Sequence, residues 1–352
     1  MKTPISKYIY ELPKELIAQF PPSQRGTTNL LVVDRTRKTF DHKKYFNVVD
    51  YINEGDLVIL NNTKVLPSRL YGKLDNGKEV ELLLLNPIPN NQNIHSKKWN
   101  ALLGGYRHKP NQTNNVHING NIIATISQQN NDGTYDIIFN NDPYETVHNL
   151  GHTPLPKYIT RQDNPEDAKR YQTIFSKIEG SVASPTASLN LTKEILSQIK
   201  KKAQIVYVTL YVGWGTFSPI RTEYIEDHQI HSEYIEIPKS SAKIINNFIN
   251  LRKKENNRKL IAFGTTVCRT LESVFKDNNC ICEYKGTTNL YIYPPFKFNV
   301  VDKLVTNFHT PKSSLLTLVS AFMGYDLMIK AYQEAIEKKY NFLSYGDSMI
   351  II

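Results

Sequence analysis

After His152 the chain alternates between two sequence patterns, and this alternation is the strongest constraint on its fold. Short runs of apolar and β-branched residues predict strands at 205–212, 260–263 and 303–308. Segments with apolar residues at helical spacing predict helices around them, at 188–203, 242–254, 266–275, 313–324 and 326–339. Such alternation is typical of a layered α/β core, in which binding sites lie at the carboxyl ends of the strands.

The first 66 residues fit the same core. Buried strands are predicted at 30–33 and 56–60. A helix is predicted at 12–20, where Pro21 and Pro22 would end it, because proline cannot continue a helix.

Residues 67–153 show a different pattern, that of short extended segments joined by tight turns. The pairs Asn76-Gly77, Asn119-Gly120 and Asp132-Gly133 are strong hairpin signals. Little helical periodicity accompanies them, which favours a small all-β domain. The predicted fold class is therefore α/β, with a small β-barrel domain inserted into a layered core domain that is discontinuous in sequence (1–66 and 154–352).

The composition bounds the class of protein. Hydrophobic residues make up 40% and charged residues 22%, and no apolar run approaches the roughly 20 residues that cross a bilayer. Three cysteines and an N-terminus without a signal-peptide pattern favour the cytoplasm. The net charge of +10 attracts polyanions such as RNA, although a lysine-rich composition bias would produce the same charge. The sequence is silent on the oligomeric state, and a monomer is favoured.

A glycine-flanked turn follows the predicted strand 205–212. It reads Gly213-Trp214-Gly215-Thr216-Phe217. Glycines at the end of a strand allow positive φ and let backbone amides approach a ligand closely, which suits a nucleoside or a carboxylate. A tight turn that merely requires glycine is the alternative interpretation.

A cluster of acids and imidazoles lies a few residues further on, at Asp227, His228, His231 and Glu233. Two imidazoles three residues apart, with carboxylates on both sides, can move protons or bind a metal ion. A metal site lacks an obvious third ligand nearby. We expect His231 or Glu233 to handle a proton or to orient substrate hydroxyls, and a hydrogen-bonded loop that supports a pocket is the other interpretation.

Three segments place hydroxyls and small residues just before predicted helices, at 181–187, 264–266 and 309–313. Ser188 or a neighbouring hydroxyl is a candidate cap of the first helix, and Ser313 is a candidate cap of the third. Free amides at helix starts bind anions well. Each segment alone indicates only a helix start, but three of them indicate one shared site.

Arginines and tyrosines supply further candidates. Arg69, Arg161, Arg170 and Arg221 are candidates for contacts with phosphate or with a substrate carboxylate. Tyr171 can stack on a base or face a cation. The chain has 21 tyrosines, so packing is the more ordinary role of any one of them.

These motifs resemble the S-adenosylmethionine:tRNA ribosyltransferase-isomerase family of queuosine biosynthesis. The resemblance runs in order along nearly the whole chain and is also carried by ELPKELIAQFPPSQR, GDLVILNNTKVLPSRL, LIAFGTTVCRTLES, LVTNFHTPKSSLLTLVSAF and YNFLSYGDSMI. It implies the two-domain layout, S-adenosylmethionine as a consumed co-substrate, tRNA as a partner and no metal. The implied reaction transfers and isomerises the ribosyl moiety of S-adenosylmethionine onto 7-aminomethyl-7-deazaguanine in tRNA, giving epoxyqueuosine-tRNA with release of adenine and methionine.

Pattern and resemblance together assign the site residues. The family carries a matching DHxxHSE segment at 227–233, which places catalysis among Asp227, His228, His231 and Glu233. Substrate binding is assigned to Arg170, Tyr171, Gln172, Ser184, Pro185, Thr186, Asn190, Tyr211, Gly213, Trp214, Gly215, Thr216, Phe217, Thr265, Thr266, Asn307, His309 and Lys312. The reaction requires a base for the C–H beside the sulfonium, a donor that helps adenine leave, and a pocket that excludes water.

The chain departs from the family pattern at five positions around the predicted pocket. Asn29 replaces arginine, Ser188 replaces glycine, Asn190 and Tyr211 replace histidines, and Trp214 fills a variable position. Asparagine can replace a neutral histidine in a hydrogen bond but cannot take a proton at neutral pH. Two alternatives therefore stay open: a divergent paralogue that cleaves S-adenosylmethionine with another acceptor or none, and a non-catalytic RNA- or nucleotide-binding protein. Release of adenine distinguishes an enzyme from a binder.

Overall fold

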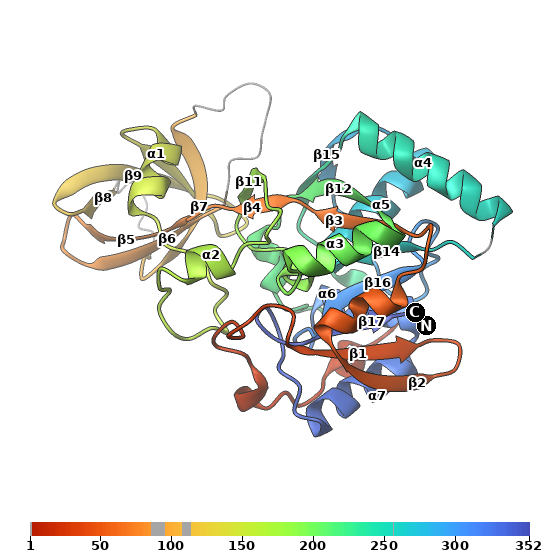
Figure 1. Cartoon of the computed structure of the whole chain (residues 1–352). Helices are drawn as coiled ribbons and strands as arrows, with labels where there is room; N and C mark the ends of the chain where they lie inside the picture. The colour runs from red at the N-terminus through yellow and green to blue at the C-terminus, as the bar shows by residue number, and fades with distance from the viewer. Residues whose placement is uncertain (1, 86–95, 108–113, 256) are drawn as a thin grey trace.

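The large sheet forms the centre of the molecule (Figure 1). The computed structural model describes residues 2–85, 96–107, 114–255 and 257–352. Within these residues the large sheet has nine strands in the order β15-β13-β12-β3-β14-β16-β17-β1-β2. Their bounds are β15 Tyr284–Thr288, β13 Glu233–Ile237, β12 Gln204–Leu210, β3 Leu57–Asn61, β14 Leu260–Phe263, β16 Lys303–Asn307, β17 Ser348–Ile351, β1 Asn29–Asp34 and β2 Thr39–Lys44.

The four central strands of this sheet run parallel. β3 pairs in parallel with both β12 and β14, and β14 pairs in parallel with β16. Their carboxyl ends therefore meet at one edge, which is where ligands bind in open α/β sheets. The flanking strands β13 and β17 pair antiparallel to β12 and β16.

Helices cover both faces of the sheet, and the strand sequence follows from that. Alternate residues of a strand point to opposite faces, so Leu57 and Ile59 pack on one side and Val58 and Leu60 on the other. All four are buried, which explains why β3 reads as a continuous apolar run. The bounds of the helices are α3 Lys193–Lys202, α4 Lys239–Lys254, α5 Thr265–Asn278, α6 Ser314–Met323 and α7 Tyr325–Glu337.

A second sheet closes into a small barrel at one side of the large sheet (Figure 1). Its described strands follow the order β10-β7-β6-β5-β8-β9, and all three predicted hairpin turns lie between its strands. The bounds are β5 Arg69–Leu74, β6 Glu79–Leu84, β7 Lys98–Gly104, β8 Asn114–Ile118, β9 Asn121–Gln129 and β10 Tyr135–Phe139, followed by α1 Pro143–Leu150. The α/β core with an inserted barrel is confirmed.

The chain enters and leaves the barrel at adjacent points. Arg69 and His152 pair as an isolated bridge, with the amide of His152 donating to the carbonyl of Arg69 at 2.8 Å. Just beyond the barrel, β4 Thr63–Val65 and β11 Ile178–Ser181 form a two-stranded parallel sheet. The barrel is thus inserted between two segments of the core that lie side by side.

Two predicted helices are wrong in extent. Residues 12–20 contain only the 3₁₀ turn Lys14–Leu16, because Ile17 pairs with Phe342 of the C-terminal segment instead of continuing a helix. The predicted helix at 188–203 begins at Lys193, where the Thr192 hydroxyl accepts from the amide of Ile195 at 3.2 Å, so Ser188 is not its cap.

The remaining short elements are six 3₁₀-helices and the single-turn helix α2 in the described ranges. They are η1 Ile5–Tyr8, η2 Lys14–Leu16, η3 Tyr45–Tyr51, α2 Asp167–Arg170, η4 Thr186–Ser188, η5 Trp214–Phe217 and η6 Ile225–Asp227. Of the helices in the described ranges, none alone is long and apolar enough to span a membrane. Only α6 with α7, which meet at a bend of 114°, would pass on length and composition.

Candidate functional site

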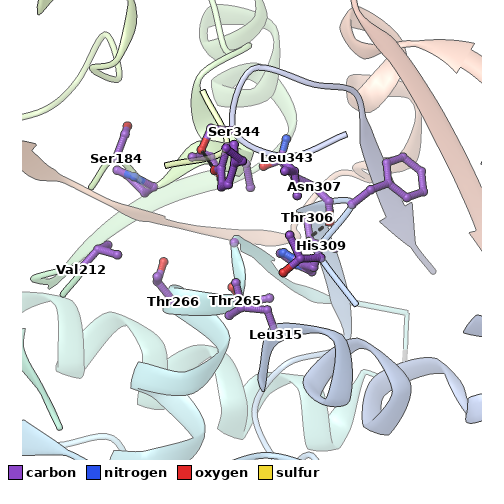
Figure 2. Close-up of a pocket in the computed structure, with 17 residues that line it drawn as sticks. Ser184, Val212, Thr265, Thr266, Thr306, Asn307, His309, Leu315, Leu343 and Ser344 are labelled. Carbon is purple, nitrogen blue, oxygen red and sulfur yellow. Dashed lines mark hydrogen bonds between the residues drawn. The ribbon is translucent and has the colours of Figure 1, made fainter. Parts of the chain in front are cut away.

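An open pocket of about 700 Å³ lies at the carboxyl edge of the parallel strands. Three segments that are far apart in the sequence meet there: 184–187, the β14–α5 junction and the β16–α6 connection. Figure 2 shows Thr265 and Thr266 at the start of α5 on one side, and Ser184 and Ser344 on the opposite side. We call it the hydroxyl pocket; its lining is Tyr158, Ser184, Pro185, Thr186, Ala187, Val212, Gly264, Thr265, Thr266, Thr306, Asn307, Phe308, His309, Thr310, Leu315, Leu343 and Ser344.

The hydroxyl pocket holds unsatisfied polar atoms. The Asn307 side-chain amide donates to the carbonyl of Asp347 at 3.2 Å, which leaves its Oδ1 without a hydrogen-bond partner within the described structure. The hydroxyl of Ser184 is likewise unpartnered, and both residues are buried. Because buried polar groups in proteins are nearly always hydrogen-bonded, these two atoms indicate a ligand that supplies the missing partners.

His309 is a neutral group of the same pocket. Burial lowers the pKa of His309 to about 3. Its Nε2 lies 2.9 Å from the Thr306 hydroxyl, and its backbone amide donates to the Tyr332 hydroxyl at 3.1 Å. At neutral pH this imidazole therefore acts as a fixed hydrogen-bonding group and carries no charge.

The start of α5 is open to the pocket, whereas the start of α6 is capped. No side chain caps α5, whose N-cap is Gly264 with φ of 107°. Only glycine tolerates that conformation without strain, so the residue fixes how the β14–α5 junction turns. At α6 the Ser313 hydroxyl accepts from the amide of Leu316 at 3.2 Å, which confirms the predicted cap.

A second cavity with charged walls adjoins the first. We call it the ion-pair pocket; its lining is Gly213, Trp214, Gly215, Ile230, His231, Ser232, Glu233, Arg269, Ser314 and Leu315. A further small cavity shares Thr265 and Thr266 with the hydroxyl pocket and shares Glu233 and Arg269 with the ion-pair pocket. The two pockets are therefore close neighbours at the same edge of the sheet.

A buried ion pair gives the second cavity its name. Glu233, at the start of β13, pairs with Arg269 of α5, and the amide of Gly213 donates to its Oε1 at 2.7 Å. Both side chains are almost completely buried, and burial lowers the pKa of Arg269 to about 10. The Glu233 carboxylate is therefore held in place by the guanidinium of Arg269 and the amide of Gly213.

The two glycines of the turn have ordinary φ values, and Gly215 matters because it leaves room for a neighbouring side chain. Neither Gly213 nor Gly215 has a positive φ, so that predicted reason is wrong. A Cβ atom on Gly215 would lie 2.4 Å from the His231 ring, whereas one on Gly213 would have ordinary contacts. Gly215 lets His231 approach the chain closely, with the imidazole centroid 4.4 Å from that of Trp214.

Several residues assigned from the sequence lie outside both pockets. Asp227 forms a surface ion pair with Lys2 at 2.5 Å, and His228 packs edge-on against Tyr291. Burial, followed by the charge of His231, lowers the pKa of His228. The segment 227–233 thus contributes only its second half, 230–233, to the cavity.

The segment at 170–172 lies outside both pockets. Arg170 donates to the carbonyl of Pro22 and pairs with Glu166, and Tyr171 is buried against Tyr345. The side-chain amide of Gln172 bonds to both the backbone amide and the carbonyl of Val65. These contacts join neighbouring segments of the core.

The remaining candidate cations also lie outside both pockets. Arg69 pairs with Glu81 and Arg161 with Asp167, so both guanidiniums are engaged within the protein. Lys312 adopts φ of 56°, and its carbonyl accepts from the amide of Ile220. Arg221 is exposed.

The five departures from the family pattern lie in different surroundings. Asn29 donates its side-chain amide to Asp347 at 3.1 Å, Ser188 and Asn190 are buried, and the Tyr211 hydroxyl donates to Glu236 at 3.2 Å. Tyr211 lines a further cavity between the barrel and the core, and Trp214 lines the ion-pair pocket. Only Trp214 therefore faces the ion-pair pocket directly, and none of the five lines the hydroxyl pocket.

The sequence-based assignment left out several wall residues, among them Arg269, Tyr158 and Ser344. Arg269 lies four positions after Thr265, one helical turn on the same face, so the spacing alone could have placed it at the site. Tyr158 and Ser344 hydrogen-bond to each other at 2.5 Å in the wall of the hydroxyl pocket. They are 186 residues apart, and no local pattern predicts their contact.

In the part of the chain that the structure describes, no group of three or more His, Cys, Asp or Glu side chains is placed to hold a metal ion. The two pockets present an imidazole, a buried ion pair, hydroxyls and helix-start residues.

These features define a pocket-bearing α/β protein with an inserted β-barrel. The chain belongs to the queuosine biosynthesis protein family, whose model matches residues 5–351. It is 43% identical over 351 residues to the S-adenosylmethionine:tRNA ribosyltransferase-isomerase of Sulfurihydrogenibium sp. (strain YO3AOP1), covering 99% of both chains. The protein of the same name from Aquifex aeolicus is 40% identical, again over 99% of both chains. The crystal structure of S-adenosylmethionine tRNA ribosyltransferase from Thermotoga maritima is similar with a TM-score of 0.55 and 30% identity, covering 98% of this chain and all of that one.

Proposed function

We propose that this protein transfers and isomerises the ribosyl moiety of S-adenosylmethionine onto 7-aminomethyl-7-deazaguanine in tRNA, with release of adenine and methionine. The observation that carries the proposal is the pair of unsatisfied buried atoms, Ser184 Oγ and Asn307 Oδ1, in a neutral pocket that lies next to a charged one. The relatives with this activity in their names span the full length of the chain.

The hydroxyl pocket would hold the nucleoside. Adenine carries an exocyclic amine that can donate to Asn307 Oδ1, and the Ser184 hydroxyl can donate or accept. The neutral His309 is suited to a hydrogen bond with a ribose hydroxyl or a ring nitrogen. Apolar walls such as Val212 and Leu315 would exclude water from reactive intermediates.

The ion-pair pocket would hold the sulfonium side of the substrate. The Trp214 ring borders this cavity, and aromatic faces attract cations. His231 lies against that ring and is exposed to solvent. We assign the removal of the C–H proton beside the sulfonium to His231, with Glu233 held in its ion pair.

The protein would meet its RNA substrate in the cytoplasm. A net charge of +10 favours association with a polyanion. We also propose that residues 67–153 form a separate inserted domain on a core of 1–66 and 154–352, which the barrel's own apolar core around Leu82, Trp99 and Ile137 supports.

The test is a product assay. Purified protein is incubated with S-adenosylmethionine and with tRNA that carries 7-aminomethyl-7-deazaguanine, and adenine and methionine are quantified by chromatography. Release only with the modified tRNA is the expected result; unmodified tRNA is the matched control. Release without any tRNA would instead indicate a paralogue with another acceptor, and no release under any condition would contradict the proposal.

A further inference from the structure

The buried guanidinium of Arg269 has no role in the chemistry proposed so far. We infer that Arg269, the starts of α5 and α6, and Glu233 form a binding site for a zwitterionic α-amino acid group, here the methionine portion of the substrate. This inference rests on the proposed function and names what the ion-pair pocket recognises.

Arg269 has donor capacity to spare. The residue is 7% exposed, and its Nε has no hydrogen-bond partner within the described residues. It lines both the ion-pair pocket and the small cavity beside the hydroxyl pocket. A guanidinium offers five N–H donors in a planar fork, and leaving one buried and unpaired is costly. A ligand carboxylate would remove that cost.

Two helix starts point to the same place. Thr265 and Thr266 open α5, Ser314 and Leu315 open α6, and all four line the cavity that also holds Arg269. The first amides of a helix are unsatisfied donors at the positive end of its dipole, and no side chain caps α5. Together with the guanidinium, these donors make a strongly anion-attracting corner.

Glu233 supplies the opposite charge. Its carboxylate pairs with the guanidinium of Arg269 and accepts from the amide of Gly213. A bare anion in this corner would be repelled by Glu233. An α-amino acid group avoids that repulsion, because its carboxylate can face Arg269 while its ammonium faces Glu233.

The position of this corner fits the rest of the substrate. It adjoins the hydroxyl pocket through the walls at Thr265, Thr266 and Leu315. In S-adenosylmethionine the amino acid group is joined to the nucleoside through the sulfonium, so the two ends need adjoining pockets of opposite character. Trp214 borders the ion-pair pocket, where the sulfonium would lie.

The test compares two unreactive ligands by calorimetry. S-adenosylhomocysteine carries the nucleoside and the amino acid group, and 5′-methylthioadenosine carries the nucleoside and sulfur alone. Arg269→Gln should weaken the binding of S-adenosylhomocysteine by about 10- to 100-fold and leave the affinity for 5′-methylthioadenosine unchanged. The matched control is Arg252→Gln, which removes a guanidinium paired with Asp302 away from both pockets and should alter neither affinity.

A ligand-side measurement covers the case in which Arg269→Gln does not fold. On the unmodified protein, S-adenosylhomocysteine with its carboxylate converted to an amide should bind about 10-fold or more weakly than the parent compound. The inference would be overturned if the acid and the amide bound equally well. It would also be overturned if Arg269→Gln lowered the affinities for S-adenosylhomocysteine and 5′-methylthioadenosine equally. Either result would mean that the ion pair of Arg269 is only structural. If the unmodified protein bound 5′-methylthioadenosine but gained nothing from the amino acid group, the inference would fail while the proposed function stood. Binding of neither nucleoside would overturn both.

Discussion

The hydroxyl pocket and the ion-pair pocket adjoin each other but are built on different physical principles. In the hydroxyl pocket every polar group is neutral, including His309, whose pKa is lowered to about 3 by burial. In the ion-pair pocket two opposite charges are buried in contact, and an exposed imidazole lies beside them. A neutral polar group can stay unpaired without a ligand at a modest cost in free energy, whereas a buried charge requires a partner within the protein.

The difference indicates a division of labour along one substrate. Neutral donors and acceptors select a nucleoside by shape and hydrogen bonding, and they do so without preferring an ionised ligand. A charged corner instead orients a charged group and tunes proton transfer beside it. Substitutions in the hydroxyl pocket should therefore lower the affinity for all nucleoside ligands equally. The effect of substitutions in the ion-pair pocket on affinity should depend on the ligand's charge.

The largest effect is expected at the boundary of the ion-pair pocket. Gly215→Val should abolish binding of S-adenosylmethionine, because its Cβ would lie 2.4 Å from the His231 ring and 2.8 Å from that residue's own Cβ. The ring cannot swing aside without moving its backbone. Calorimetric titration with S-adenosylmethionine measures the loss, with circular dichroism as a check on folding.

Gly213→Ala is the matched change in the same turn. Its Cβ would lie 3.6 Å from Glu233, an ordinary contact, and its φ of −88° suits alanine. This variant should lose much less affinity than Gly215→Val. Equal affinity of Gly215→Val and the unmodified protein would remove the turn from the site.

The next effect concerns turnover. His231→Ala should lower kcat by about 10²- to 10⁴-fold, the usual contribution of a general base, while the melting temperature changes little because the side chain is exposed. Single-turnover release of adenine with modified tRNA measures it. A fall in melting temperature that accounts for the lost activity would instead show that His231 only supports the loop.

The sequence predicted most of the large sheet because burial on both faces leaves a clear signal. Continuous apolar runs such as 57–60 and 260–263 are strands, and the paired turn residues such as Asn76-Gly77 are hairpins. The helix at 12–20 was wrong because the apolar spacing there serves packing and strand-like pairing with Phe342. Tertiary contacts of this kind override a weak helical preference.

The site was predictable where it followed the strand–helix junctions and not where it depended on distant contacts. Thr265, Asn307 and His309 come directly after strand ends, so pattern alone placed them. The contact between Glu233 and Arg269 joins the start of β13 to the buried helix α5, and only the fold reveals it. Tyr171 and Gln172 lie in a recognisable segment, yet their side chains turn toward Tyr345 and Val65.

A change in the hydroxyl pocket should separate the two pockets. Asn307→Ala removes the unpaired Oδ1. It should weaken the binding of S-adenosylhomocysteine and of 5′-methylthioadenosine to the same extent, by about 10-fold. The ratio of the two affinities, measured by calorimetry, is the quantity that matters. A loss confined to the amino acid-bearing ligand would contradict the division of labour between the pockets.

The smallest effect is on stability and follows from the neutral state of His309. Its pKa is lowered by burial from 6.5 to about 3, and the groups around it, Thr306 and the tyrosines 10 and 332, bring no charge at neutral pH. Between those two pKa values the unfolded chain binds more protons than the folded protein, so the free energy of unfolding falls as the pH drops below 6.5. From pH 7 to pH 5 the free energy of unfolding of the unmodified protein should fall by about 2 kcal/mol more than that of His309→Gln. Urea unfolding of both proteins at the two pH values measures this difference; equal losses would mean that water reaches His309 and that the hydroxyl pocket is not the dry, neutral counterpart of the ion-pair pocket.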